Sequence, residues 1–367
     1  MAKKRWGKIK LKTIADNKYR FAYSFDLDSG FYYRTGIIDQ EGNDTGTDPF
    51  RSSFPHLLDV GIMGHCVHGA AGLCLQAGVQ CYQNGLEKNE PNMSLEDYKS
   101  IIDQCKDKLF QIALGGRGDP EMHESFLEIL SYSRENEIIP NMTTSGFGLT
   151  TRHALMIKEH CGAAAVSWYR SPYTLKAIEL LLSLGIKTNI HYVLGNNTID
   201  EAFDLLCSNK FPAAINRIIF LLHKPVGMGE SKNVLNPLDP KVKEFFNLLN
   251  MEEYINKVGF DSCCIPGIIN FSPKIHLNSI DTCEGARYSA YISPNMVMTP
   301  CSFDQQYQWG LSLKQYSIKE VWESQPFEIF RSTLKMSCPE CDKKKDCLGG
   351  CPIKKEIVLC AKKQEVK

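Results

Sequence analysis

The number and spacing of the cysteines in this sequence indicate that they bind metal. The 367-residue chain has 15 cysteines, and three of them share one glycine-rich stretch, as Cys66-x7-Cys74-x6-Cys81. Three thiolates on one loop can bind three irons of a four-iron cluster and leave the fourth iron free to bind a small molecule. Because the spacing is loose, three ordinary loop cysteines are the alternative.

A second, denser group of cysteines lies toward the C-terminus. Its seven members are Cys283, Cys301, Cys338, Cys341, Cys347, Cys351 and Cys360. Four of them fall within fourteen residues, which is a strong signal for metal ligands. A four-thiolate zinc site uses similar spacings, but seven cysteines exceed the ligands of one tetrahedral zinc. Two four-iron clusters need eight ligands, so we expect one more from Cys263 or Cys264.

Composition limits the classes of partner and the compartment. The chain has 42 Lys plus Arg and 42 Asp plus Glu, a balance that does not suggest binding to nucleic acid or to a membrane surface. No apolar run approaches the ~20 residues of a membrane span, and the basic N-terminus has no apolar signal core behind it. The sequence therefore predicts a cytoplasmic protein. Since reducing cytosol disfavours disulfides, clustered cysteines there indicate metal ligands or redox groups.

The elements that must position the cysteines alternate between strand and helix. Six strands are predicted, at residues 57–63, 109–114, 138–143, 163–168, 187–194 and 215–222. Ser94, Asp119 and Ser171 occupy helix-cap positions, and Gly185 closes a helix. Six such units imply a parallel sheet with right-handed crossovers, and six is short of the eight of a closed barrel. The loop with Cys66 follows the first strand, at the carboxyl edge where such sheets carry their chemistry.

Three segments are predicted. Residues 1–55 read as a short β-rich segment, with aromatic and β-branched runs on either side of a turn at 28–30. Residues 56–257 form the partial (β/α)6 barrel, so the fold class is α/β with a TIM-like partial barrel. Residues 258–367 form a cysteine-rich domain held together by metal, in which regular elements are hard to predict.

The C-terminal cysteine pattern resembles a known family. Cys-x2-Cys-x5-Cys-x3-Cys, with a later Cys and a widely spaced pair before it, is similar to the SPASM domain of radical S-adenosylmethionine (SAM) enzymes. The run 348–352, Leu-Gly-Gly-Cys-Pro, also resembles that family's ending of the motif. The resemblance covers roughly residues 57 to 360. It implies a SAM-binding partial barrel with three [4Fe–4S] clusters, one that binds SAM and two auxiliary ones.

The resemblance also implies which cysteines hold each cluster. The SAM cluster is assigned to Cys66, Cys74 and Cys81. The first auxiliary cluster is assigned to Cys263, Cys283, Cys301 and Cys351, where Cys263 is the predicted fourth ligand. The second auxiliary cluster is assigned to Cys338, Cys341, Cys347 and Cys360. An open iron on an auxiliary cluster, left free for a substrate thiolate, is the alternative to a ligand from Cys263.

Residues predicted to contact SAM lie at strand ends. The run 115–119, Gly-Gly-Arg-Gly-Asp, resembles the family's Gly-Gly-Glu motif, which binds the methionine amino group, and glycine allows a close approach of the backbone. The predicted contacts are Gly115, Gly116, Arg117, Asp119 and Ser167. The sequence departs from the family in the longer spacing of its first three cysteines, and in the missing Glu, whose replacement stays open.

These features predict an enzyme that matures a ribosomally made peptide. A 5′-deoxyadenosyl radical would abstract hydrogen from the peptide, and the most favoured product is a cysteine thioether. Carbon–carbon crosslinking and sulfatase-type oxidation of a protein Cys or Ser are the nearest alternatives. The alternative outside the enzymes is a non-catalytic protein: an iron–sulfur or zinc scaffold, or an electron carrier.

The expected partners are a Cys-containing precursor peptide and an electron donor such as flavodoxin or ferredoxin, with no nucleic acid and no membrane. Because the first 55 residues read as strands, we expect leader recognition to use them, for example by strand addition, or to use a separate protein. One of the neighbouring residues His191 and Tyr192 is expected to face the barrel interior, because successive strand residues point to opposite faces.

Overall fold

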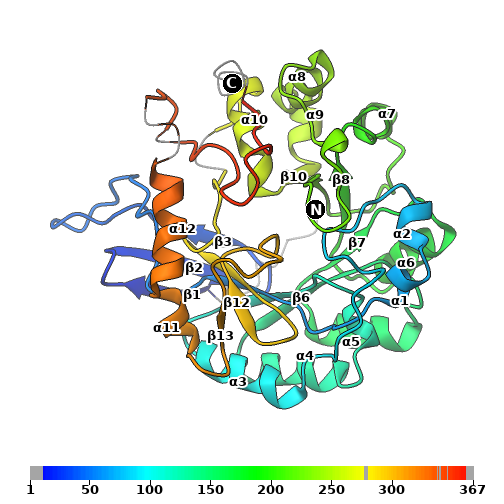
Figure 1. Ribbon diagram of the computed structural model, residues 1–367, viewed down its shortest axis with the longest axis horizontal. Coiled ribbons are helices and arrows are strands. Elements are labelled where there is room, and N and C mark those ends of the chain that lie inside the picture. Colours follow the sequence, from blue (N-terminus) through cyan, green and yellow to red (C-terminus); the bar gives the residue numbers. More distant parts are fainter. Residues whose placement is uncertain (1–10, 277–279, 337, 339, 345, 361–367) are drawn as a thin grey trace, which may run out of the picture.

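A computed structural model describes residues 11–276, 280–336, 338, 340–344 and 346–360. Its main feature is a ten-stranded sheet with the order β10-β9-β8-β7-β6-β5-β4-β11-β12-β13 (Figure 1). The central six strands are β4 (Leu57–Val60), β5 (Gln111–Leu114), β6 (Ile139–Thr144), β7 (Ala164–Ser167), β8 (Thr188–Leu194) and β9 (Arg217–Leu222). Each pairs with the next in parallel. The six predicted strands and the partial barrel are therefore confirmed.

Helices that follow the individual strands in the sequence surround the sheet (Figure 1). They are α1 (Val67–Ala70), α2 (Leu73–Gln76), α3 (Leu95–Cys105), α4 (Phe126–Glu135), α5 (Thr151–His160), α6 (Pro172–Ser183), α7 (Ile199–Cys207), α8 (Pro240–Asn247) and α9 (Glu252–Ile255). Short 3₁₀ turns are η1 (Pro120–Met122), η2 (Ser231–Asn233) and η3 (Leu248–Asn250). Among the described helices, none combines the length and hydrophobicity that crossing a membrane requires.

Local hydrogen bonds explain where two of these helices begin. The hydroxyl of Ser94 accepts from the N–H of Asp97 at the start of α3, and Ser171 accepts from Thr174 at the start of α6. The predicted cap Asp119 behaves differently. It precedes η1, but its carboxylate accepts hydrogen bonds from the N–H and the hydroxyl of Ser145. Asp119 therefore ties the loop after β5 to the loop after β6.

The C-terminal segment contributes strands to the same sheet. β10 (Val258–Phe260) is parallel to β9, and β11 (Ser289–Ile292) is parallel to β4. β12 (Val297–Thr299) and β13 (Leu311–Ser312) follow in antiparallel order. The helical elements are η4 (Ser262–Cys264), α10 (Ile265–Phe271), α11 (Ile318–Trp322) and α12 (Gln325–Met336). The sheet thus runs across residue 257, where a boundary was predicted. Strands of two to four residues are too short for the periodicity that reveals a strand in a sequence.

The N-terminal segment forms an antiparallel sheet of β1 (Leu11–Asp16), β2 (Phe21–Asp26) and β3 (Tyr32–Arg34), as predicted. The buried face of β2 packs against Phe110, Ile139 and Tyr288. Those three residues lie at or just before the first residues of β5, β6 and β11. This small core therefore covers the amino ends of the barrel strands and leaves the carboxyl ends for the site.

Candidate cofactor and cluster site

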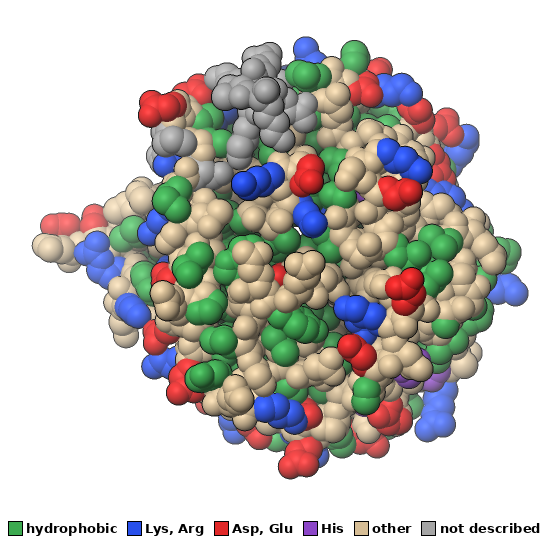
Figure 2. Space-filling model, in the orientation of Figure 1, with side chains coloured by type: hydrophobic (Ala, Val, Ile, Leu, Met, Phe, Trp, Pro, Cys, Tyr) green, Lys and Arg blue, Asp and Glu red, His purple; other side chains and the backbone are tan. Residues whose placement is uncertain are grey.

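A cavity of about 600 Å³ lies at the carboxyl ends of the parallel strands. Gly115, Thr143 and Ser167, at or next to strand ends, and His191 within β8 form part of its wall. Six of the predicted cluster ligands also line it: Cys81, Cys263, Cys283, Cys301, Cys347 and Cys351. Members of all three predicted ligand sets therefore share one cavity, although the chain separates them by up to 270 residues. Side chains of both charge signs are scattered over the molecular face in Figure 2.

The loop after β4 brings two of its cysteines together around a glycine. A Cβ placed on Gly85 would lie 3.6 Å from the Sγ of Cys66 and 3.5 Å from the Sγ of Cys81. Burial raises the pKa of Cys66 to about 11, so this thiol stays protonated at neutral pH until a cation replaces the proton. Burial, and then the nearby Cys81, also raise the pKa of Cys74. The three thiols fit a cluster as donors, but among the described residues no three His, Cys, Asp or Glu side chains stand as in a closed metal site.

The long spacer between Cys74 and Cys81 is fastened to the barrel by side chains from two later loops. Arg170, which follows β7, donates to the carbonyl of Ala77 at 3.0 Å, and Asn197, which follows β8, donates to Gly78 at 3.3 Å. Arg170 is itself held by Glu201, which accepts from its Nε at 2.7 Å. The spacer therefore has a defined position even though it is longer than in the family motif.

A third anchor comes from the loop after β9. The amide oxygen of Gln80 accepts from the N–H of Glu230 and from Asn233, both at 3.0 Å. The N–H of Met228 donates to the carbonyl of Cys81 at 3.0 Å. These bonds fix the backbone on both sides of the last cysteine of the motif. These anchoring contacts could not be predicted from the sequence, because polar loop residues carry no spacing signal.

Gly115 and Gly116 line the cavity, as the predicted SAM contacts require, and so does Ser167. Gly116 has φ +96°, a conformation that favours glycine, and a Cβ there would lie 3.1 Å from the hydroxyl oxygen of Tyr291. The turn after β5 thus presents bare backbone to the cavity at two successive residues.

Arg117 and Asp119, predicted as further SAM contacts, do not line the cavity. Arg117 is 4% exposed, and its guanidinium donates to the carbonyl of Gly64 and to Glu90, both at 2.7 Å. It therefore braces the loop two residues before Cys66. Asp119 is engaged with Ser145, as described above. Direct contact of either residue with SAM stays a prediction.

All four members of the first auxiliary set line the cavity: Cys263, Cys283, Cys301 and Cys351. Burial raises the pKa of the first three thiols, and the pKa of Cys283 rises to about 11. The nearby Cys351 raises each of these pKa values further. Cys264 is placed differently: it is fully buried in the hydrophobic core, and its Sγ lies 4.0 Å from the carbonyl of Phe220. Only the first cysteine of the neighbouring pair faces the cavity.

The second auxiliary set forms a separate group after α12. Burial raises the pKa of Cys347, and Cys360, Cys338 and Cys341 add to the rise. Of these four, Cys347 reaches the cavity wall. The assignment of this set and of the first auxiliary set to two clusters stays a prediction.

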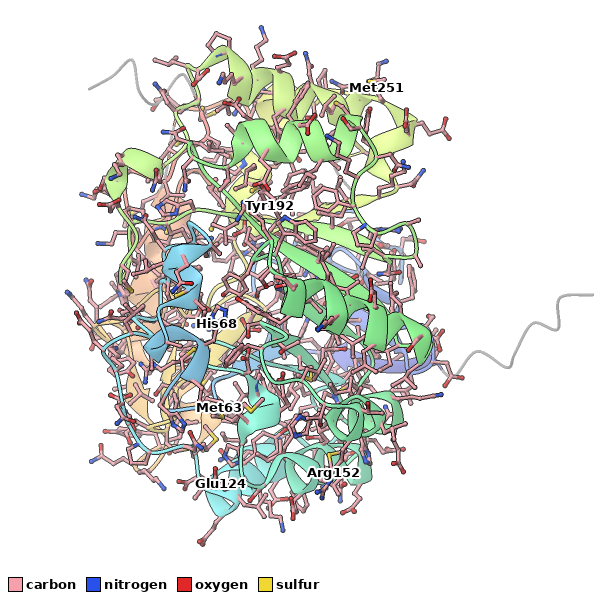
Figure 3. The ribbon with its side chains drawn as sticks, turned by 90° about the vertical axis from the view of Figure 1, so that its right-hand side faces the viewer. Met63, His68, Glu124, Arg152, Tyr192 and Met251 are labelled. Atoms are coloured by element: carbon pink, nitrogen blue, oxygen red, sulfur yellow. The ribbon has the colours of Figure 1, made fainter. Side chains whose placement is uncertain are left out.

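Buried ionisable side chains also face the cavity between the cysteine groups. Burial raises the pKa of Asp59 to about 6 and that of Glu284 to about 7, and it lowers the pKa of His191 to about 4. His191 is thus the inward-facing member of its pair. Tyr192 (Figure 3) points to the other side, where its hydroxyl donates to Glu201. Asp59 was not among the predicted site residues, although a carboxylate within the apolar strand 57–60 is a usable signal.

Comparison with known proteins agrees with this arrangement. The family model described as an iron–sulfur cluster-binding domain, SPASM, matches residues 283–348, so the predicted SPASM domain is confirmed there. No curated protein sequence matches the chain. SuiB of Streptococcus suis, solved bound to its precursor peptide SuiA, is similar with a TM-score of 0.68 and 14% identity over 94% of both chains.

Two further solved structures share the fold. SuiB bound to S-adenosylmethionine has a TM-score of 0.62 and 17% identity over 85% of this chain and 78% of its own. Native anSMEcpe with bound AdoMet has a TM-score of 0.58 and 17% identity over 81% of this chain and 89% of its own. At these identities the likeness shows the fold, which extends through the barrel and the C-terminal domain.

Proposed function

We propose that this chain is a radical SAM enzyme that modifies a ribosomally made peptide. The observation that carries the proposal is a cavity whose wall includes a cysteine from each predicted set: Cys81 of the three-cysteine loop, all four of the first auxiliary set, and Cys347 of the second. When bound, SAM on a four-iron cluster supplies a 5′-deoxyadenosyl radical, which removes a hydrogen atom from an unactivated carbon. The other parts of the site belong to the chain itself.

The residues of the chain support binding of SAM beside the first cysteine loop. Cys66, Cys74 and Cys81 offer three thiolates, so one iron of a four-iron cluster keeps an open position. Gly115 and Gly116 leave room for a ligand against the backbone, because neither carries a Cβ. The cavity volume falls within the range of about 300–1,000 Å³ that is usual for small-molecule sites. It therefore suits a cofactor and a side chain of a peptide.

A peptide is the substrate class that the comparisons support. SuiB was solved with its precursor peptide, and its likeness to this chain extends over 94% of both chains. We propose that the product is a thioether between a cysteine sulfur and a carbon of the same peptide. Forming that bond removes two hydrogens, of which one leaves as the abstracted atom. The other would leave as a proton, for which the Asp59 carboxylate is available, and an electron, which a four-iron cluster held by one of the four-cysteine sets would accept.

The test starts with anaerobically reconstituted protein. We expect about twelve irons per chain, from three four-iron clusters, and 5′-deoxyadenosine when SAM and dithionite are added. Replacing Cys66, Cys74 and Cys81 together with Ala should abolish 5′-deoxyadenosine and leave about eight irons. The control is Cys207→Ala, an exposed cysteine at the end of α7, which should leave both readouts unchanged.

Two outcomes would contradict the proposal. Tightly bound zinc with little iron would indicate the scaffold alternative. Cleavage of SAM that survives the triple substitution would show that the active cluster is elsewhere. Mass spectrometry of a Cys-containing peptide then decides the bond: a loss of two hydrogens with no free thiol indicates a thioether, and the same loss with a free thiol indicates a carbon–carbon crosslink.

A further inference from the structure

Lys224 is a buried cation at the boundary between the barrel and the first auxiliary set. It follows β9, is 4% exposed, and lines the cavity. Its ammonium donates to the Oδ2 of Asp261 at 2.5 Å and to the carbonyl of Leu222 at 3.0 Å. Asp261 follows β10, which is the strand next to β9. Burying an ammonium is costly unless it is paired, so the ion pair with Asp261 is what allows Lys224 to remain charged inside the site.

Lys224 and Asp261 border the first auxiliary set. Both line the same cavity as Cys263, Cys301 and Cys351, and Asp261 stands only two residues before Cys263. A cation and a carboxylate of opposite charge therefore face the space beside these cysteines.

Aromatic packing fixes the position of this cation. The Nζ of Lys224 lies 4.2 Å from the ring centroid of Phe303, two residues after Cys301. Phe303 also packs against Tyr82, which directly follows Cys81, with ring centroids 4.5 Å apart. A continuous contact therefore connects the first cysteine loop, through Tyr82, Phe303 and Lys224, to the first auxiliary set.

We propose that Lys224 and Asp261 set the reduction potential of the auxiliary cluster held by the set Cys263, Cys283, Cys301 and Cys351. This inference rests on the proposed function, which supplies the cluster. A cluster gains one negative charge on reduction, so a fixed nearby cation favours the reduced form and a fixed carboxylate disfavours it. Lys224 therefore raises the potential, which suits a cluster that accepts the electron lost by the peptide. Lys224 is a positioning residue here, because it acts through the cluster.

A role for Lys224 in binding a substrate carboxylate fits the structure less well. Its side chain is 1% exposed, and two of its three ammonium hydrogens already have oxygen partners within the protein. A ligand carboxylate would have to displace Asp261 from a buried ion pair. The geometry instead points to a permanent charge beside the cysteines.

The test is a redox titration, followed by electron paramagnetic resonance, of anaerobically reconstituted protein. The background carries Ala at Cys66, Cys74 and Cys81, so that only the two auxiliary clusters report. Into it we introduce Lys224→Met or Asp261→Asn, which have opposite electrostatic effects. The control is Lys232→Met, whose side chain is 72% exposed. We expect one of the two potentials to fall in Lys224→Met and to rise in Asp261→Asn, while the other potential stays unchanged in both.

Opposite shifts distinguish a charge effect from a structural one. The inference would be overturned if the reduction potential shifted with the same sign in both variants, or if it did not shift in fully iron-loaded protein. Either result would leave the proposed function standing. If Lys224→Met loses iron, the result for Asp261→Asn decides: a raised potential supports the inference, and an unchanged one overturns it. A wild-type chain that takes up no auxiliary iron overturns the proposed function, and this inference with it.

Discussion

Replacing Gly116 with Ala tests whether the turn after β5 needs a bare backbone. Gly116 has φ +96°, which L residues rarely adopt, and a Cβ there would lie 3.1 Å from the hydroxyl of Tyr291. Holding a residue with a side chain in such a conformation costs about 1–3 kcal/mol. The tight contact adds to this cost unless the tyrosine ring shifts. We therefore expect Gly116→Ala to lower the free energy of unfolding by about 1–3 kcal/mol.

The neighbouring glycine provides the matched control. Gly115 does not have a positive φ, and a Cβ there would meet only Thr143, at 3.9 Å, an ordinary van der Waals distance. Gly115→Ala should therefore leave stability nearly unchanged. Adding Tyr291→Phe to Gly116→Ala removes the contact with the hydroxyl and keeps the backbone strain. This double variant should recover only the part of the loss that the contact causes.

Chemical denaturation of the reconstituted protein in the absence of SAM measures these differences in the free energy of unfolding without any contribution from bound SAM. A second assay measures SAM affinity after reconstitution. If the turn relaxes away from its strained shape to relieve 1–2 kcal/mol, affinity should fall by roughly 5- to 30-fold, since about 1.4 kcal/mol is a factor of ten. Equal stability and equal SAM affinity of the Gly115→Ala and Gly116→Ala proteins would refute the reasoning.

Three further predictions concern single side chains. Cys263→Ala should lose iron from one auxiliary cluster, while Cys264→Ala should keep its iron content and lose only stability. Iron loss in Cys264→Ala alone, measured by iron analysis, would show that Cys264 is the ligand instead. Arg170→Gln should speed chelator-driven iron loss from the SAM cluster, because the spacer between Cys74 and Cys81 loses its hydrogen bond to the barrel. The control Lys241→Gln, at an exposed ion pair, should not change the rate. Equal rates of iron loss in the two variants would show that Arg170 does not anchor the spacer. Burial raises the pKa of Asp59 to about 6, so the folded state retains a proton that the unfolded state releases, and stability should fall as pH rises from about 4 to 6. Asp59→Asn should flatten that part of the stability profile by up to about 3 kcal/mol, and an unchanged pH dependence would contradict the assignment.

Much of the architecture follows from patterns that lie within short stretches of sequence. Each barrel strand is a buried run of four to seven residues, and the helices between the strands have recognisable caps, so the six parallel strands could be predicted. The two cysteine groups were equally visible, because ligand spacing is a local property. The strands β11 to β13 escaped prediction because they are short. The first of them, β11, also depends on pairing with β4, more than 200 residues earlier.

The sequence by itself determined the donor types, the spacing of the cysteines and the order of the elements that hold them. It left open whether Cys263 or Cys264 faces the site, because the two neighbours have the same chemistry. Only the packing of η4 directs Cys263 to the cavity and Cys264 into the hydrophobic core. The pair formed by Lys224 and Asp261 was also beyond prediction, since 37 residues separate its members and only the adjacency of β9 and β10 brings them together. Tertiary structure decided these points because long-range pairing, rather than local periodicity, determines which side chains share the cavity.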